Sequence, residues 1–574
     1  MNKELLKRWV KQPPRNPLIQ YLRDAEKDIA INYLDHDDLI VDLATEINLS
    51  KFINKKIIRL DASKESSDFA KSLNVNSIKE YSYFNPQKPK FTIKDNSVDV
   101  IVSLGPFDWH FLNIPETINE CRRILKKGGH LIFSVPTRNS SYCSEKNMKK
   151  FRYYHLPTLI NDVSSWGVIQ NLGLIYQPHK YSYLLPNWIQ KLFISYCNFK
   201  TKNYTKNRKI TKAGYAVLDV NFPEYKDYLD KALNSLFRPL KQNGFWKKNH
   251  ISRGLIFDEN LNWCEDKENK NRYAPFTLLG VMNWRKTNDV KIYDSKIQST
   301  LNFYKEYITQ GNICKIPSYG LGPLLYAYVV SYSLYKIADY QKLAKQIVTY
   351  LESNSKVNTS EDALILIGIS EYCKVFHHSA QTLNKWYKFI LKKQNKVGLF
   401  LFDNPTTKRH QNQMYVCWGL MSAAQVLNKS LKPIEQCLNY TIQNRMLDDG
   451  GIIWEDLNFF DKSKLWLLTK VGRKEPYWQF FFECHQTFFA NTILNYYLAG
   501  GKKNYDSELN KALNWIFGNN KLNKDLVQLS QIGVPMRMID INGEYRIKRQ
   551  MFKGTYEIGA YILALNNYIR WFRK

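Results

Sequence analysis

The feature that most constrains the fold is a change of hydrophobic pattern partway along the chain. Before about residue 220, apolar runs of strand length recur, namely "DLIVDLA" from Asp38, "KKIIRLD" from Lys55, "SVDVIVSLG" from Ser97 and "GHLIFSVPT" from Gly129. From about residue 290 the runs become longer and follow helical spacing. We therefore expect two domains of different class, since 574 residues exceed what one hydrophobic core usually serves.

The first part predicts a doubly wound α/β domain over residues 1–222. Its apolar runs are continuous and do not alternate with polar residues, which is typical of parallel strands covered on both faces. Between them, "PETINECRRILKKGG" has Pro115 near its start and Gly128 at its stop, as a helix does. Strands that alternate with helices build an open, mostly parallel sheet.

One segment of this domain carries a family resemblance. The stretch "FTIKDNSVDVIVSLGPFDWHFLNIPETINECRRILKKGGHLIFSVPT", Phe91 to Thr137, resembles the second half of the class I S-adenosylmethionine-dependent methyltransferase core. The shared features are the aspartate-containing strand, a loop with aromatic residues and His, a helix, and the Leu-Lys-x-Gly-Gly-x-Leu turn. The resemblance implies S-adenosylmethionine as cofactor, with "GLIYQPHKYSY" and "GYAVLDVNF" as the last two strands.

The resemblance also implies roles for individual residues. Asp42 falls at the end of the first strand, and Asp61 at the end of the second strand falls where the family binds the ribose hydroxyls. Ser103 and Leu104 would line the adenine side, and Thr45 would contact the cofactor. Asp108, Trp109 and His110 would face the transferred methyl group, with Asp108 or His110 as base. The alternative is structural, with Asp61 capping the helix of "DASKESSDFA" and Trp109 and His110 packing a loop.

The turn after the first strand departs from the family. A glycine-rich turn brings the backbone close to the ligand and takes positive φ at low cost. Here Ala44, Thr45, Glu46 and Ile47 occupy it, and the first glycine of the chain is Gly105. Small Ala44 and Thr45 would permit a looser cofactor pose, and Glu46 could reach a ligand ammonium. The sequence leaves open a working methyl-donor site and a vestigial one that keeps only the fold.

The second part predicts an all-α domain of helical hairpins over residues 271–574. Amphipathic runs such as "DSKIQSTLNFYKEYI" alternate with more apolar ones such as "GPLLYAYVVSYSLYKIA". Five pairs are visible, and "PEYKDYLDKALNSLF" with "YAPFTLLGVMNW" would supply a sixth, so residues 223–270 are a linker or the first toroid helix. At the level of fold this resembles the (α/α) toroids of six-hairpin glycosidases and glucuronyl epimerases.

In a toroid, the starts of the inner helices open on one face, where distant loop residues converge. We expect Glu483, His485, Tyr556 and Glu557 there as catalytic residues, since "YWQFFFECHQTFF" surrounds two of them with aromatics. The other candidates at this mouth are Asp403, His410, Gln413, Glu455, Asp456, Arg537 and Lys553. Carboxylates, His and Tyr suit acid and base steps on sugars. Helix caps and structural ion pairs are the alternative.

Charge and cysteine usage bear on partners and compartment. The formal charge is +31, and a basic surface attracts nucleic acid, anionic lipid headgroups or acidic sugars. A general Lys, Asn, Ile and Tyr bias explains most of it, because no nucleic-acid module signature appears. Basic residues do gather in Phe199–Lys212, which a solvated loop also explains. Nine dispersed cysteines and no apolar membrane-spanning run predict a cytoplasmic protein, whose oligomeric state the sequence leaves open.

Three functional hypotheses follow. The leading one is an S-adenosylmethionine-dependent methyltransferase-like protein that acts on a carbohydrate or glycan intermediate. The second is a carbohydrate-active toroid, namely an epimerase, lyase or hydrolase on an acidic sugar, with a non-catalytic methyltransferase-like domain. The third is a binding or assembly protein that uses its basic surface.

Overall fold

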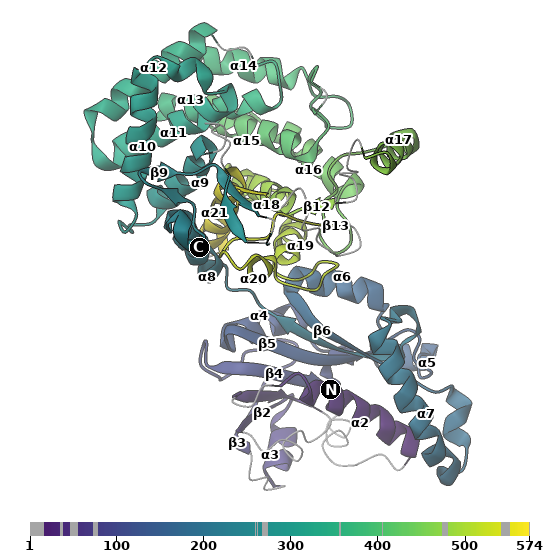
Figure 1. Cartoon of the computed structure of the whole chain (residues 1–574). Helices are drawn as coiled ribbons and strands as arrows, with labels where there is room; N and C mark the ends of the chain where they lie inside the picture. Colours follow the sequence, from purple (N-terminus) through teal and green to yellow (C-terminus); the bar gives the residue numbers. More distant parts are fainter. Residues whose placement is uncertain are drawn as a thin grey trace. The chain divides into compact units, whose positions relative to one another are not determined.

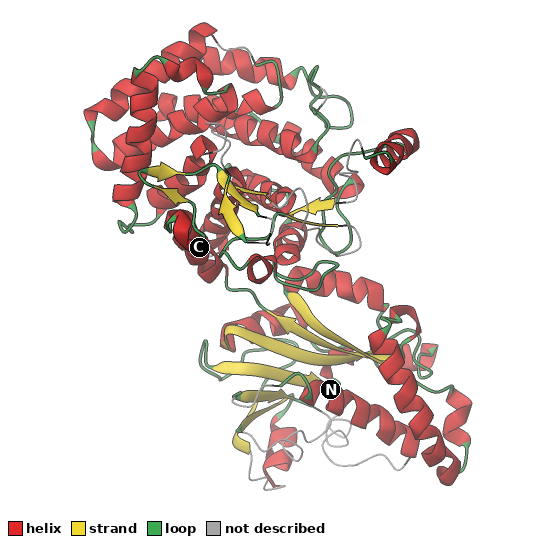
Figure 2. Ribbon diagram, viewed as in Figure 1, coloured by secondary structure: helices red, strands yellow, loops and turns green. Residues whose placement is uncertain are grey.

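The chain was analysed as a computed structural model, which divides into two compact units, Met1–Glu224 and Tyr225–Lys574. The structure describes residues 16–34, 38–45, 56–72, 78–258, 260, 262–266, 274–354, 357–404, 406–472, 480–540 and 552–572. Each unit has its own architecture, α/β in the first and helical in the second (Figures 1 and 2).

The first unit is built on a mixed sheet, with seven strands among the described residues, in the order β3-β2-β1-β4-β5-β7-β6. Its strands are β1 (Ile40–Leu43), β2 (Ile57–Asp61), β3 (Ile78–Tyr83), β4 (Val98–Leu104), β5 (Leu125–Pro136), β6 (Val168–Ile175) and β7 (Tyr215–Asn221). Strands β1 to β5 are parallel, and β7 runs antiparallel to both of its neighbours. The predicted doubly wound α/β fold is therefore confirmed, with one antiparallel strand added.

Helices cover both faces of this sheet (Figure 2). Helices α4 (Ile114–Ile124) and α6 (Leu156–Trp166) pack on one face through Ile118 and Leu159. On the other face lie α2 (Pro17–Ile31) and α7 (Asn187–Lys206), while α3 (Lys64–Ser72) packs on β2 and β3 near the edge. Because both faces are covered, the central strands need apolar residues at successive positions, as the sequence has them.

Two local predictions in this unit differ from the structure. Helix α4 ends at Ile124, before the predicted stop at Gly128, because Leu125 already pairs with Val98 as the start of β5. Strand β3 has no counterpart in the predicted runs. Its residues "IKEYSY" are exposed or half-buried, so it lacks the continuous apolar run that marks its neighbours.

The second unit is a ring of paired helices. Six inner helices in the described residues form its wall, each packing on the next, and α21 packs back on α9 to close the ring. They are α9 (Ala274–Thr287), α11 (Ser318–Tyr335), α13 (Ile365–Phe376), α15 (His410–Leu427), α18 (Glu483–Leu498) and α21 (Thr555–Phe572). The buried residues of α9, α11 and α18 run around most of each helix. Helices buried on all sides belong to a core, so these are the inner members of the pairs.

An outer helix precedes each inner one. The outer members are α8 (Tyr225–Phe237), α10 (Asp294–Thr309), α12 (Ala338–Asn354), α14 (Gln381–Leu391), α16 (Lys432–Asn444) and α19 (Asp506–Ile516). Each buries an apolar stripe at helical spacing, such as Leu343, Ile347 and Leu351 of α12. The predicted (α/α) toroid is confirmed, and α8 with α9 supplies its sixth pair.

Additional short elements join these pairs. Strands β8 (Trp246–Lys247), β9 (His250–Ile251), β10 (Gly254–Phe257) and β11 (Trp263–Glu265) precede α9, and β12 (Phe480–Phe482), β13 (Met538–Asp540) and β14 (Phe552–Gly554) lie near α18 and α21. Helix α17 (Phe459–Lys470) stands apart from the ring (Figure 1) and has no fully buried side chain among its described residues. None of the helices that the structure describes combines the length and apolarity required to cross a bilayer.

Candidate functional site

The turn after β1 keeps a glycine-like backbone without glycine. Ala44 has φ +50°, in the left-handed region that L side chains rarely adopt, and its side chain is buried. The turn is held by its neighbours, since Ala44 N donates to Leu60 O at 2.8 Å and Thr45 N to Asp42 Oδ1 at 3.0 Å. The chain therefore turns after β1 as the methyltransferase resemblance implies. Glu46 and Ile47 lie outside the described residues.

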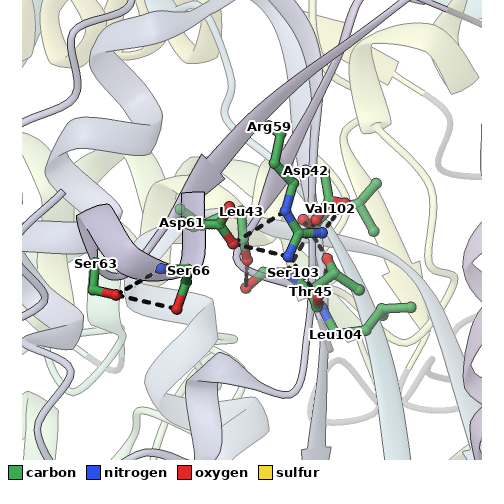
Figure 3. Close-up of polar contacts among 10 residues, drawn as sticks. All are labelled: Asp42, Leu43, Thr45, Arg59, Asp61, Ser63, Ser66, Val102, Ser103 and Leu104. Atoms are coloured by element: carbon green, nitrogen blue, oxygen red, sulfur yellow. Dashed lines mark hydrogen bonds and ion pairs between the residues drawn. The ribbon is translucent and has the colours of Figure 1, made fainter. Parts of the chain in front are cut away.

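Asp42 and Asp61 are joined by an arginine that lies between them (Figure 3). Arg59 Nη1 donates to Asp42 Oδ2 at 2.6 Å, and Arg59 Nη2 donates to Asp61 Oδ1 at 2.8 Å. Arg59 Nη2 also donates to the backbone oxygen of Thr45 at 3.0 Å. All three charged side chains are buried. Fully buried charges need such pairing, and here it ties the ends of β1 and β2 to the turn.

Sequence reasoning did not single out Arg59, although a signal was present. Arginine interrupts the apolar run "KKIIRLD", and a charge within a buried strand requires a partner. The structural alternative for Asp61, a helix cap, is not what the geometry shows. Ser63 performs that role, with its Oγ accepting from Ser66 N at 3.1 Å (Figure 3).

One oxygen of this cluster is left for a ligand. Asp61 Oδ2 is buried and has no hydrogen-bond partner in the described structure, while Oδ1 takes both bonds from Arg59. An unpaired buried carboxylate oxygen at the carboxyl end of β2 fits a ribose hydroxyl donor. The residues present are thus compatible with the adenosyl group at this position.

Ser103 and Leu104 lie at the end of β4, next to this cluster (Figure 3). Ser103 Oγ donates to Leu43 O at 3.0 Å, and Leu104 N approaches Thr45 Oγ1 at 3.5 Å. Thr45 Oγ1 in turn donates to Val102 O at 3.3 Å. The predicted cofactor residues Asp42, Thr45, Asp61, Ser103 and Leu104 therefore come together, through bonds to Arg59, to one another and to the backbone of β1 and β4.

A cavity of about 340 Å³ opens beyond the carboxyl ends of β4 and β5. Two acidic side chains, Asp108 and Glu26, line it with Arg23 of α2. Tyrosines 142, 153 and 215 line it as well. Its volume lies at the lower end of the range for small-molecule sites. Asp108 is a predicted catalytic residue, whereas Glu26 and Arg23 come from a helix distant in sequence, which no local motif connects to the strands.

Both acids in this cavity hold protons unusually tightly. Burial raises the pKa of Glu26 to about 8, with Arg23 offsetting part of the effect. Burial also raises the pKa of Asp108 well above its ordinary value, and the nearby Glu26 adds to the shift. Asp108 Oδ1 is buried without a hydrogen-bond partner in the described structure. In its ionised form, a carboxylate with a raised pKa is a stronger base towards a substrate proton.

His110 lies outside this cavity. It is exposed on the loop after β4, and its Nε2 bonds to Met148 O at 2.7 Å. Trp109 is buried in the core on the α4 side and stacks on Phe111. Of the two residues considered as base, only Asp108 lines the cavity.

In the toroid, four predicted residues form a buried ionic cluster. Lys553 of β14 pairs with Glu483, the first residue of α18, and lies 3.7 Å from Glu557 of α21. Arg537 Nε donates to Glu557 Oε1 at 2.9 Å. Tyr556 joins the cluster, since its hydroxyl donates to Glu557 Oε1 at 2.9 Å. Burial raises the pKa of Glu483 to about 7, although Lys553 lowers it in part. Glu483 Oε2 is buried without a partner in the described structure.

The two histidines of the toroid lie side by side and are fully buried. Their ring centroids are 5.4 Å apart, and His410 Nε2 bonds to His485 O at 3.1 Å. Burial lowers the pKa of His485 to about 3 and that of His410 well below its ordinary value. Both rings are therefore neutral at physiological pH. Of the remaining candidates, Asp456 pairs with Arg445 at 2.8 Å and Gln413 bonds to the backbone of Phe400. Asp403 is exposed and lies 3.7 Å from Lys393, and Glu455 lies 4.0 Å from Arg409.

Cavities lie at both ends of the inner ring. At the helix starts, a cavity of about 50 Å³ is lined by Tyr556, Tyr415 and Glu361. At the helix ends, a cavity of about 330 Å³ is lined by residues of all six inner helices. Of these two cavities, the one at the helix ends has the size that small-molecule sites usually have.

The larger toroid cavity is polar and carries excess positive charge. Lys286, Lys374 and Arg570 line it against a single carboxylate, Glu371, which pairs with Lys286. Ser370 Oγ is buried there and has no hydrogen-bond partner in the described structure. Amide side chains and two aromatic rings complete the wall, namely Asn283, Gln425, Asn495, Tyr326 and Trp418. The sequence did not reveal this site, because its lining residues are spread over six helices that lie far apart in the chain.

Comparison with known proteins gives one family match. Residues 43–133 match the family described as a methyltransferase domain. A search of curated proteins found no match to the chain.

Solved structures resemble each unit separately. Cellobiose 2-epimerase from Bacillus thermoamylovorans is 15% identical over 59% of this chain and 99% of its own, with a TM-score of 0.42. Unsaturated glucuronyl hydrolase from Bacillus sp. GL1 is 12% identical over 61% of this chain and 97% of its own, with a TM-score of 0.42. A SAM-dependent methyltransferase from Thermotoga maritima, described as a possible histamine N-methyltransferase, is 15% identical over 36% of this chain and 90% of its own, with a TM-score of 0.25.

The geometry and the family match agree for the first unit. Strands β1 to β5, the left-handed turn after β1 and the acid at the end of β2 all fall within or next to the matched residues. The chain thus carries a methyltransferase domain at residues 43–133, joined to an (α/α) toroid.

Proposed function

We propose that the α/β unit transfers a methyl group from S-adenosylmethionine to a hydroxyl group of a carbohydrate. The observation that carries this proposal is the cavity beyond β4 and β5, where Asp108 and Glu26 lie at the carboxyl ends of a methyltransferase sheet. Ligands of open α/β sheets bind at this edge. Dispersed free cysteines favour a reducing, cytoplasmic setting for this activity.

Different residues hold the cofactor and the acceptor: Asp61 and the turn at Ala44 serve the cofactor, and Asp108 and Glu26 serve the acceptor. Asp61 Oδ2 accepts a ribose hydroxyl, and the left-handed turn at Ala44 carries the backbone past the ligand. When bound, S-adenosylmethionine supplies an electrophilic methyl group. Asp108 Oδ1, in its ionised form, would accept the proton of the acceptor hydroxyl as that hydroxyl oxygen takes the methyl group, the methyl–sulfur bond breaks and the sulfonium leaves as a thioether. Glu26, which is largely protonated at neutral pH, donates a hydrogen bond to the acceptor.

The carbohydrate part of the proposal rests on the larger toroid cavity. Hydroxyl-rich ligands need many hydrogen-bonding groups, and this cavity offers amides, hydroxyls and two aromatic faces. Its excess positive charge favours a sugar that carries a carboxylate or another anionic group. Lys374→Ala and Arg570→Ala are therefore expected to weaken binding of acidic oligosaccharides, and loss of binding to neutral ones alone would contradict this.

Calorimetry with S-adenosylhomocysteine tests the cofactor site. The wild-type chain is expected to bind, and Asp61→Asn is expected to weaken binding by at least about tenfold, because a charged acceptor of hydroxyl donors is lost. Asp99→Asn is the matched control, since Asp99 lies at the start of β4, at the opposite end of the strand from Leu104, and pairs with Lys126. Absence of heat at millimolar ligand contradicts the proposed activity.

Asp108→Asn tests the chemical step. Methylation of oligosaccharides by labelled S-adenosylmethionine is expected to fall about 100-fold or more, as for loss of a general base. Binding of S-adenosylhomocysteine should remain unchanged. Equal losses in binding and turnover would mean that Asp108 positions the cofactor and does not take the proton.

A second candidate function is carbohydrate chemistry in the toroid. It is favoured by Glu483, a buried carboxyl group with one unpartnered oxygen and a pKa of about 7. The cavity next to this cluster measures about 50 Å³, which holds water and not a sugar ring, so we rank it second. Turnover of an acidic sugar without S-adenosylmethionine, lost in Glu483→Gln, would reverse this order.

A further inference from the structure

Helix α7 exposes an apolar stripe to solvent. Trp188, Leu192 and Phe199 are 66%, 71% and 64% exposed. Directly before the helix, the turn η3 (Lys180–Leu184) exposes Leu184 to 80% and Tyr181 to 64%. Single exposed apolar residues are common, but a contiguous set on one helix marks an interaction surface.

The stripe lies on the side of α7 that faces away from the sheet of the first unit. The buried residues of the helix are Gln190, Cys197 and Thr201, of which Cys197 packs in the core on the α2 face of the sheet. At about 3.6 residues per turn, Trp188, Leu192 and Phe199 fall opposite these three. Neither fold stability nor the sheet core requires apolar residues there. The stripe is therefore available to a partner.

Positive charge surrounds the stripe. The segment 179–212 contains eight Lys and Arg residues and no Asp or Glu, namely Lys180, Lys191, Lys200, Lys202, Lys206, Arg208, Lys209 and Lys212. All of them except half-buried Lys200 are exposed. On the helix, Lys191 and Lys202 flank the stripe on one side and Lys200 on the other, as the helical spacing requires. The basic run Phe199–Lys212 thus continues directly from the apolar stripe.

We propose that η3 and α7 dock the protein on a lipid bilayer with anionic headgroups. A helix with Trp, Leu and Phe on one side and lysines beside them is suited to the bilayer interface, where the rings enter the acyl boundary. Long lysine side chains then reach anionic headgroups, each contributing to attraction at the surface. A protein partner would need an acidic rim around an apolar groove, whereas anionic lipid supplies both properties together. This proposal is independent of the methyl-transfer proposal.

Sedimentation with lipid vesicles tests the docking surface in the full-length chain. Binding is expected to vesicles of phosphatidylcholine with phosphatidylglycerol, and to weaken strongly with pure phosphatidylcholine or with rising salt. Trp188→Ser with Leu192→Ser is expected to reduce the partition coefficient at least about tenfold, since two large apolar side chains no longer enter the lipid. Lys191→Glu with Lys202→Glu should reduce binding to the anionic vesicles alone.

A matched control removes two exposed apolar residues elsewhere. Val290 and Ile292, 44% and 73% exposed, lie in a loop of the toroid unit. Val290→Ser with Ile292→Ser is expected to leave vesicle binding unchanged, and an equal loss in this control overturns the proposal.

A second copy of the chain is the competing occupant of the stripe. Light scattering of the wild type and of the Trp188→Ser, Leu192→Ser variant distinguishes it. A dimer that becomes monomeric in this variant, together with no binding of the wild type to anionic vesicles, overturns the lipid proposal. Circular dichroism of the variant should match the wild type, because both substituted side chains are exposed.

Discussion

At the scale of single residues, the methyltransferase sheet keeps its backbone turn by unusual means. Ala44 adopts φ +50°, and the buried Arg59 neutralises two carboxylates at the ends of adjacent strands. A left-handed Ala costs about 1 kcal/mol relative to glycine, which the bonds of Ala44 N and Thr45 N offset. The turn is thus specified by its surroundings and not by its own residue type.

Ala44→Gly tests this conclusion. The substitution is expected to lower the free energy of unfolding by no more than about 0.5 kcal/mol. Glycine increases the conformational entropy of the unfolded chain, but it also removes the backbone strain that Ala44 has at positive φ. Ala62→Gly is the control, since Ala62 is equally buried after β2 without a positive φ, and it should cost about 1 kcal/mol. Urea denaturation measures both. Equal losses would mean that the turn at Ala44 is not strained.

The carboxyl group of Glu26 predicts a pH dependence of stability. Its pKa is raised from 4.5 to about 8, so the folded state binds the proton more tightly than the unfolded state. Stability from this group is fully present below pH 4.5 and is lost as the pH rises to about 8. The loss amounts to up to roughly 4 kcal/mol. Glu26→Gln should flatten this dependence, measured by denaturation between pH 5 and 8, while exposed Glu145→Gln should leave it unchanged.

At the scale of elements, glycines allow the inner helices of the toroid to pack closely. A Cβ on Gly280 of α9 would lie 2.1 Å from the backbone oxygen of Gly559 in α21. Likewise, a Cβ on Gly368 of α13 would lie 2.3 Å from Gly322 O of α11. Both positions allow backbone approaches that any side chain prevents. The closing contact of the ring, α21 on α9, is one of these.

Gly280→Ala is therefore expected to be strongly destabilising. The added methyl group meets backbone atoms that cannot move aside, so the free energy of unfolding should fall by at least about 2 kcal/mol. Gly320→Ala in α11 is the matched control, because its nearest neighbour is a side-chain carbon at 3.3 Å. That variant should differ from the wild type by less than about 1 kcal/mol. Thermal unfolding measures both, and similar melting of the two variants would contradict the close-packing argument.

At the scale of the whole molecule, each unit has its own core and its own cavity. The sheet of the first unit buries two apolar clusters on its faces, and the ring of the second is closed by its last helix. Without α21, helices α9 and α18 would each lose a packing partner and expose apolar surface.

Deletion of α21 is expected to unfold the toroid and leave the α/β unit folded. Amide hydrogen exchange should show loss of protection in α9, α11 and α13, while β1, β4 and β5 stay protected. Deletion of α17, which has no fully buried side chain among its described residues, is the control and should leave the ring protected. Retained protection of α9 without α21 would mean that closure is dispensable.

Sequence alone determined the central strands of the first unit and the hairpin helices of the second, with their order along the chain. Continuous apolar runs marked the central strands and helical periodicity marked the hairpins, since both depend on near neighbours along the chain. Asp42, Thr45, Asp61, Ser103, Leu104 and Asp108 were also predicted from the methyltransferase resemblance, which places them at strand ends that meet at one edge of a parallel sheet. Strand β3 was not predicted, because an exposed edge strand needs no apolar run.

Only the tertiary structure decided which side chains share a site. Glu26 of α2 lines the same cavity as Asp108, 82 residues further along the chain, and the larger toroid cavity takes lining residues from six helices. It also placed Glu483 and Glu557 in a buried ionic cluster and His110 outside the cavity. No local pattern in the sequence predicts such contacts. Side-chain spacing along a helix or strand specifies which residues share a face. Packing between distant elements decides what that face contacts.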